Sequence, residues 1–184
     1  FYGCSSLRGE LRLPDSLETI GEFAFYNCSG ITGELTIPDK VSMLSYGVFA
    51  GVTGVAALTI GSGMNYIRTD SDSWHAFYQM NGVKTVTFRG VTPPSRNSIS
   101  IFYSMLNLET VYVPEGTYKA YVEVYKDNMP EWVRLKEIGS GDFLISDGEL
   151  ISYSGNDKEV TVPEGVTGIG GNAFLNAKVE KVTL

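Results

Sequence analysis

Two cysteines and one histidine are the residues of this 184-residue sequence best suited to nucleophilic or metal chemistry. Cys4, Cys28 and His75 together are too few for a four-ligand zinc site. Any Ser-His-Asp or Cys-His catalytic arrangement would have to use His75, because no other histidine exists. His75 follows Trp74 in a segment without the glycines of a nucleophile elbow. We therefore expect no catalytic residue.

Three further patterns have the spacing of known ligand sites. Asp70 and Asp72 resemble the start of a calcium loop, but the third acidic ligand, the glycine and the closing Glu are missing, so we expect a solvated loop. Gly-Ile-Gly-Gly-Asn-Ala at 168–173 matches a dinucleotide-binding fingerprint. The internal repeat described below explains these glycines better than a nucleotide site does. Glycosidase-like carboxylate pairs are harder to exclude. Glu10 and Glu34 nevertheless recur at one repeat position, which is typical of a solvated face.

The composition excludes several classes of partner. The formal net charge is −7, and binding a phosphate backbone or an anionic membrane surface requires clustered Lys and Arg, so we expect neither nucleic acid nor such a surface as a partner. No run of 18 apolar residues occurs, so we expect no membrane insertion by this segment. Twenty-one Gly, eleven Tyr and nine Phe indicate many turns joining short strands. No feature requires a cofactor.

The elements that position these side chains come from an internal repeat of about 24 residues. One phenylalanine, the anchor, marks each copy: Phe1, Phe25, Phe49, Phe77, Phe102 and Phe174. Cys4 and Cys28 both lie three residues after an anchor, so a disulfide between adjacent coils is geometrically conceivable. Val, Met and Ala occupy this position in the other copies, which favours a small buried apolar side chain instead.

A short strand with alternating polarity follows the anchors, at 11–13, 35–37, 58–60, 86–88, 111–113, 160–162 and 182–184. One coil cannot fold alone, because its stabilisation is smaller than its cost in conformational entropy. Burying its seven or so apolar side chains stabilises the coil by roughly 10–20 kcal/mol. Ordering about 24 residues costs more, at about 1–2 kcal/mol each. Stacked coils add burial between neighbours and pair their strands into a parallel sheet with a spacing of about 4.8 Å. The sequence predicts a mainly β repeat solenoid.

The repeat resembles a known family. Ile-Pro-Asp-Lys-Val at 37–41 followed by Gly-Val-Phe at 47–49 is similar to the "IPxxVxxIGxxAFxxC" repeat of BspA-like leucine-rich repeat proteins, and residues 13–25 and 162–174 fit better still. The resemblance covers nearly the whole chain and implies a right-handed leucine-rich-repeat coil stack. It also implies a protein that is secreted or displayed on the surface of a host-associated bacterium, as most members are, and a role in adhesion, in which several members are implicated.

The first run of repeats departs from the pattern before it ends. The third coil is longer, with the excess around 69–75, and the usual Val-x-x-Ile-Gly segment is missing after Phe88. Apolar residues at i, i+3, i+4 and i+7 predict a short amphipathic helix near 117–126: Tyr118, Tyr121, Val122 and Tyr125. We expect Trp132 to close this run, as similar stretches do in relatives.

A second run of repeats follows. Segments 143–146 and 150–153 flank Asp147-Gly148, which predicts a hairpin near 143–153. We expect a leucine-rich repeat run with a divergent closing segment over 1–138 and the start of a second run over 139–184, with a soft boundary at 139–141 and continuous packing. Because the chain begins and ends within a repeat, we interpret it as an excised piece, whose unpaired ends favour end-to-end self-association as an artefact.

Two surfaces are candidates for binding. The first is the outward strand column: Arg12, Thr36, Thr59, Thr87, Tyr112, Thr161 and Thr183. Solenoids often bind partners on the sheet face, and Tyr112 with Arg89 is typical of interfaces, which makes Arg12, Arg89 and Tyr112 candidate binding residues. The alternative is structural, because threonine ladders favour parallel strands.

The second surface is aromatic. Tyr2, Tyr26, Tyr78 and Tyr103 each follow an anchor, and Trp74 lies nearby. Trp74 and Tyr78 are the candidate residues here: such rings stack on sugars or anchor a protein, or else they half-cover the next turn.

Our hypothesis is a non-enzymatic, surface-exposed repeat protein that binds a protein or glycan of a host or neighbouring cell. Two alternatives stay open. The first is a structural spacer that displays another domain, and the second is a carbohydrate-binding module using exposed aromatics.

Overall fold

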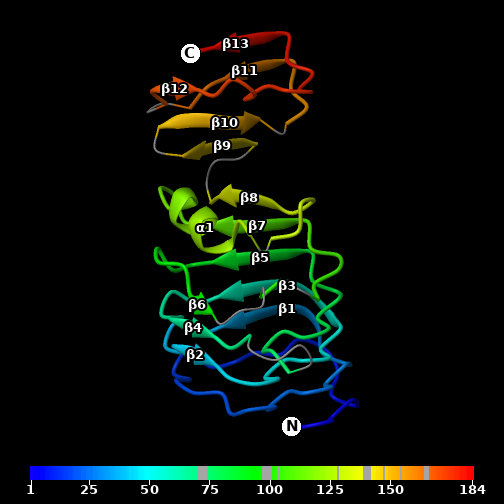
Figure 1. Cartoon of the computed structure of the whole chain (residues 1–184). Helices are drawn as coiled ribbons and strands as arrows, with labels where there is room; N and C mark the ends of the chain where they lie inside the picture. The colour runs from blue at the N-terminus through cyan, green and yellow to red at the C-terminus, as the bar shows by residue number, and fades with distance from the viewer. Residues whose placement is uncertain are drawn as a thin grey trace.

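The chain winds into a stack of coils with its two ends at opposite ends of the stack (Figure 1). The computed structural model describes residues 1–69, 74–96, 101–102, 104–127, 129–138, 142–146, 148–153, 155–163 and 166–184. Asp70, Asp72, Tyr103, Asp147 and the expected boundary at 139–141 lie outside the described residues. The predictions about the loop at 70–72, about Tyr103, about the turn conformation of Asp147 and about the boundary therefore stay predictions.

One five-stranded parallel sheet runs along the stack. Its strands, in spatial order, are β1 (Thr32–Ile37), β3 (Gly54–Ile60), β5 (Thr85–Phe88), β7 (Thr110–Val113) and β8 (Arg134–Glu137). The alternation predicted from the sequence is confirmed, because Leu58 and Ile60 are buried while Thr59 between them is only half-buried. The inward apolar side chains of all five strands belong to one continuous hydrophobic core, and β8 adds the buried Glu137, whose Oε1 accepts from the amide of Tyr118 at 2.9 Å.

A second, smaller sheet lies on another side of the coils. It consists of β2 (Met43–Leu44), β4 (Tyr66–Ile67) and β6 (Ser95–Arg96), all parallel. Leu44 and Ile67 are fully buried, as the Val-x-x-Ile pattern requires. At 95–96 the sequence lacks this pattern, yet the strand forms, because the amide of Ser95 donates to the carbonyl of Asn65 at 2.8 Å. This main-chain bond and a second one from the Ser95 hydroxyl to the same carbonyl, at 3.0 Å, continue the sheet there.

The anchor phenylalanines form a stack of rings on the third side of the coils. The ring centroids of Phe25 and Phe49 lie 5.4 Å apart with planes 4° from parallel, and Phe77 follows at 6.2 Å from Phe49. Two residues after the anchors the backbone is left-handed, with φ between 53° and 77°, at Gly3, Asn27, Gly51, Gln79 and Asn176. Gly and Asn suit this conformation best, which explains their recurrence.

Neighbouring coils approach each other closely at several glycines, of which Gly82 is one. A Cβ added at Gly82 would collide with the carbonyl oxygen of Thr53 and lie 2.8 Å from that of Val55, whereas a Cβ at Gly21 would meet nothing within 4 Å. We expect Gly82→Ala to lower the free energy of unfolding by about 1–3 kcal/mol, because backbone must move. Gly21→Ala should change it by less than about 0.5 kcal/mol. Urea titration of both variants tests this, and equal effects would contradict the close approach.

The predicted helix is present as α1 (Tyr118–Tyr125), with Tyr121 and Tyr125 buried. Figure 1 shows α1 on the same side of the stack as β2, β4 and β6, directly above them. The hydroxyls of Tyr121 and Tyr125 donate to the carbonyls of Gly90 and Pro94, at 2.6 and 2.8 Å. These two bonds and the buried rings dock the helix on the preceding coil.

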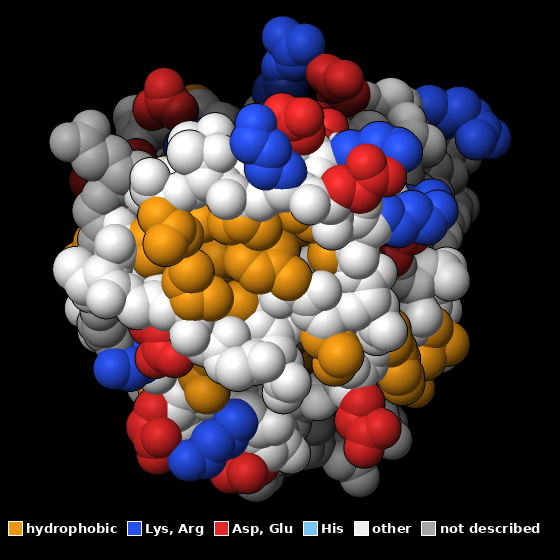
Figure 2. Space-filling model, turned by 90° about the horizontal axis from the view of Figure 1, so that it is seen from above, with side chains coloured by type: hydrophobic (Ala, Val, Ile, Leu, Met, Phe, Trp, Pro, Cys, Tyr) orange, Lys and Arg blue, Asp and Glu red, His pale blue; other side chains and the backbone are white. Residues whose placement is uncertain are grey.

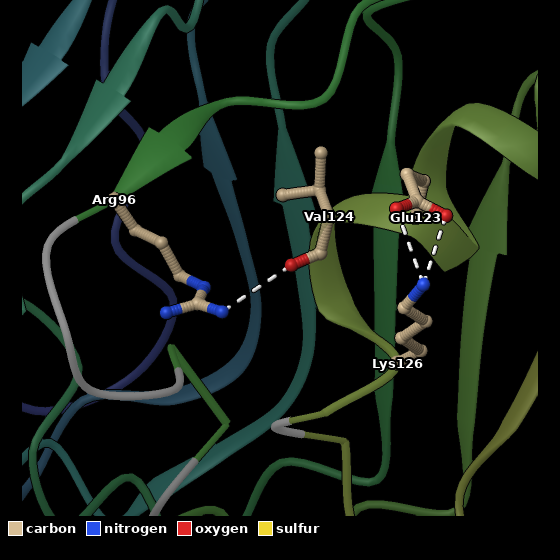
Figure 3. Close-up of polar contacts among 4 residues, drawn as sticks. All are labelled: Arg96, Glu123, Val124 and Lys126. Carbon is tan, nitrogen blue, oxygen red and sulfur yellow. Dashed lines mark hydrogen bonds and ion pairs between the residues drawn. The ribbon is translucent and has the colours of Figure 1, made fainter.

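The last turn of α1 is held by charged side chains (Figure 3). Arg96 of β6 donates from its Nη2 to the carbonyl of Val124 at 3.2 Å. A cation at this end also complements the helix dipole. Lys126 pairs with Glu123 at 3.0 Å, one turn away.

The C-terminal part has its own small sheets and core. The predicted hairpin is confirmed as β9 (Phe143–Ser146) antiparallel to β10 (Glu149–Tyr153), and β12 (Gly168–Ile169) adds to β10 in parallel. β11 (Glu159–Thr161) and β13 (Lys181–Thr183) form a separate parallel pair. Leu150, Val162 and Ala173 form a second core. The division at residue 138 stays a prediction.

Two expectations about the strand column were wrong. Residues 11–13 form no strand, because coil 1 meets β1 only through the bridge Gly9–Ile31, where Gly9 turns left-handed (φ 89°). Thr161 and Thr183 lie in their own two-stranded sheet rather than in the main column. Trp132 is 63% exposed, and β8 continues the main sheet after it; its role as the closing residue of the first run stays a prediction.

Candidate binding surfaces

His75 lies in the core rather than in an exposed loop. It is 1% exposed, and its Nε2 shares a 3.3 Å hydrogen bond with Oγ of Ser104. That Oγ also accepts from the amide of Gln79 at 2.9 Å, and the ring of Tyr78 packs edge-on against the imidazole at 5.3 Å. This Ser–His contact joins two coils and supports the left-handed Gln79. Its burial makes it unsuitable for attacking a substrate.

Both cysteines carry free thiols. Cys28 is fully buried, as expected for its column, but Cys4 is exposed because it lies in the first coil. Burial raises the pKa of the Cys28 thiol, which disfavours the thiolate that a nucleophile needs. Within the described part of the chain, no group of three or more His, Cys, Asp or Glu side chains is placed to hold a metal ion.

The outward side of the main sheet carries two columns of side chains in register. One column reads Glu34, Ala57, Thr85, Thr110 and Arg134, and the other reads Thr36, Thr59, Thr87, Tyr112 and Lys136. We call this surface the sheet face. It is acidic at β1, neutral and threonine-rich in the middle and basic at β8. A partner bound along it would meet opposite charges at its two ends.

Two of the predicted sheet-face residues lie on or next to adjacent strands, β5 and β7. Tyr112 stands between Thr87 and Lys136 in adjacent strands, and it is half-buried. Arg89 is exposed and directly follows β5, with its amide donating to the carbonyl of Ile60 at 2.9 Å. Lys136 was missed from the sequence, although the alternation of Val133, Leu135 and Glu137 around it is the signal of a strand.

Arg12 lies at the opposite end of the sheet face. Its guanidinium pairs with Glu10 at 3.1 Å, and both side chains are exposed. Glu34 and Thr36 face them across a hollow of about 320 Å³, where coil 1 leaves the ladder. Because β3, β5 and β7 extend the sheet beyond β1, Arg12 and Tyr112 do not form one site.

The structure separates the two predicted aromatic residues. Tyr78 packs on His75, whereas Trp74 contacts Phe23 and Tyr26, with ring centroids 5.4 and 5.6 Å away. In the coil between them, Gly47 occupies the repeat position of Phe23 and Ala50 occupies that of Tyr26. These small residues leave space for the indole of Trp74. Phe23 was missed, because its position is unremarkable in the repeat.

The last coil exposes its apolar side chains. Seen from above in Figure 2, hydrophobic groups gather near the middle of this end face and charged groups lie toward its rim. Ile169, Val182 and Leu184 are 45%, 40% and 87% exposed, and Ile169 and Leu184 line a hollow of about 600 Å³. The corresponding side chains of inner coils are buried by the next coil.

Comparison with known proteins identifies the repeat. The family model described as BspA-type leucine-rich repeat region matches residues 1–130 and 145–184, in six copies. The chain belongs to this family. BspA-type leucine-rich repeats indicate a module for protein interactions, and leucine-rich repeat regions are generally non-catalytic. Neither a curated protein nor a solved structure matches this BspA-type chain. Over the residues described, its helix is too short to cross a membrane.

Proposed function

We propose that this BspA-type chain is a non-enzymatic binding module on a bacterial surface, and that its sheet face binds a protein of a host or neighbouring cell. The observation that carries the proposal is the unbroken five-stranded sheet, whose outward columns place Tyr112 between threonines and the basic Lys136. The flat backbone fixes these side chains in advance, so little conformational entropy is lost on binding. Tyr and Arg are the residue types that most often dominate such interfaces.

The test is a pull-down against extracellular-matrix proteins and surface proteins of neighbouring bacteria, with the double variant Tyr112→Ala/Arg89→Ala alongside. Removing both side chains should weaken saturable binding at least about tenfold, which corresponds to about 1.4 kcal/mol. Tyr112→Phe keeps the ring and should bind nearly as well. Arg8→Ala removes an equal charge from an exposed position outside the two columns and should have no effect.

If the double variant still bound saturably with unchanged affinity, the binding site would lie outside the sheet face. Failure of every protein on the panel would instead favour the spacer, a segment that holds another domain away from the cell without binding a ligand itself.

A further inference from the structure

Three aromatic rings in mutual contact form a cluster beside the anchor stack. The centroids of Phe23 and Tyr26 lie 5.8 Å apart, and Trp74 lies 5.4 Å from Phe23 and 5.6 Å from Tyr26. Phe23 and Trp74 meet edge to face, at 86°. Trp74 is 42% exposed, and Phe23 and Tyr26 are half-buried. We call these three residues the aromatic platform. Tyr2 extends it, stacked on Tyr26 at 4.9 Å.

Phe23 holds its ring on this surface with an unfavourable backbone conformation. Its φ is 55°, in the left-handed region that bulky side chains rarely adopt. The same position in the next coil is Gly47, with φ 56°. A Cβ on Gly47 would lie 2.5 Å from Cε1 of Phe23, so the absence of a side chain there makes room for the ring. Glycine would fit position 23 without strain, and strain retained at a surface residue points to a function.

Polar side chains border the aromatic platform. Glu22, which precedes Phe23, is exposed, and its Oε1 accepts a 2.8 Å hydrogen bond from Oγ of Ser45. The amide of Phe23 donates to the carbonyl of Tyr46 at 2.9 Å, which places Tyr46 in the next coil beside the platform. The guanidinium of Arg68 lies 4.2 Å over the ring of Tyr46. The exposed polar group next to the platform is therefore the carboxylate of Glu22, which the buried Ser45 holds in place.

We propose that the aromatic platform is a binding site for an uncharged pyranose sugar. The C–H groups on one face of a pyranose carry partial positive charge and complement the negative face of an aromatic ring. Sugar hydroxyls donate hydrogen bonds, which suits the exposed carboxylate of Glu22, and the buried hydroxyl of Ser45 holds that carboxylate in place. The rings already fill the space between one another, so they form a surface for stacking rather than a cage for an ammonium group. Glu22 and the net charge of −7 disfavour anionic glycans.

The site is separate from the sheet face. Phe23, Tyr26 and Trp74 flank the anchors, whereas the sheet-face residues lie on the strands that follow them. Sugar binding at the platform thus neither requires nor excludes a protein on the sheet. A variant of the sheet face is the matched control for a variant of the platform.

Fluorescence of Trp74 reports on the site directly. The chain has two tryptophans, so Trp132→Phe leaves Trp74 as the sole indole. This variant is titrated with cellopentaose, maltopentaose, chitotetraose and lacto-N-tetraose as neutral probes, and with sialyllactose and a heparin hexasaccharide as charged ones. We expect a saturable change in Trp74 emission with at least one neutral probe and none with the charged ones.

Phe23→Gly separates a binding role from a packing role. It removes one ring and relieves the backbone, so the affinity for the neutral probe should fall at least tenfold while the Tm stays equal or rises. Tyr112→Ala should leave the affinity unchanged.

Four results would contradict the proposal. The first is the absence of a response to every neutral probe, and the second is a response to charged probes alone. The third is a Phe23→Gly variant that loses Tm but binds the sugar as before, which would make Phe23 a packing residue. An equal loss in Tyr112→Ala would also contradict a site at the platform.

Discussion

Phe49→Ala lowers the free energy of unfolding by about 3–5 kcal/mol, the range for truncating a buried phenylalanine. The Phe49 ring is fully buried between those of Phe25 and Phe77, so both neighbouring coils lose contacts when it is removed. A rigid backbone on either side prevents the cavity from closing. Urea denaturation followed by circular dichroism measures the loss.

Thr59→Ala is the control for this prediction. Thr59 lies in the middle of β3, on the outward column, and its neighbours in register are Thr36 and Thr87. Its truncation should cost well under 1 kcal/mol, as at ordinary surface positions. If both variants lost the same stability, the assignment of inward and outward columns would be wrong.

Stability falls steeply as the pH rises above about 10, because two tyrosines are buried under α1. Burial raises the pKa of both Tyr121 and Tyr125, and for Tyr125 the neighbouring Tyr121 adds to the increase. An unfolded tyrosine ionises near pH 10. Because the tyrosine pKa is higher in the folded state, its contribution to the free energy of unfolding is complete below pH 10. This contribution is lost progressively as the pH rises from 10 to the pKa of the folded state. Each tyrosine contributes about 1.4 kcal/mol per pH unit in this window.

The double variant Tyr121→Phe/Tyr125→Phe tests the source of this dependence. At pH 7 it should lose about 1–3 kcal/mol, because each hydroxyl donates to a buried carbonyl, of Gly90 or Pro94. Between pH 10 and 11 its unfolding free energy should decline much less steeply than that of the unchanged chain. Part of the decline with pH should remain in the double variant, because burial also raises the pKa of Tyr118. Identical slopes would assign the alkaline sensitivity to other groups.

The elements that local pattern determines were predictable from the sequence. Inward and outward residues of β1, β3, β5 and β7 follow from alternation with a period of two, and the core contains the predicted Leu35, Leu58 and Val111. α1 follows from four apolar residues at helical spacing, and the hairpin from Asp-Gly between two apolar segments. In each case a few neighbouring residues carry the signal.

Contacts that depend on stacking were not predictable. β6 and β8 form because a preceding strand offers free backbone groups, so a weak pattern suffices. Trp74 reaches Phe23 and Tyr26 past a coil that carries Gly47 and Ala50, a meeting that no single repeat encodes. The contact of His75 with Ser104 likewise spans 29 residues. These are the features on which the candidate surfaces depend.

The regular joint between coils also bears on how such a chain changes in length. Phe25 donates its amide to Val48 and Phe49 donates to Ala76, each at 2.9 Å, and the rings of these coils are nearly parallel. A duplicated segment of about 24 residues inserted at such a joint would present the same upper and lower surfaces as its template. Unequal recombination within the gene would thus lengthen the protein by about 4.8 Å per copy without disturbing either neighbour. Length then becomes a trait that selection adjusts separately from the chemistry of either surface.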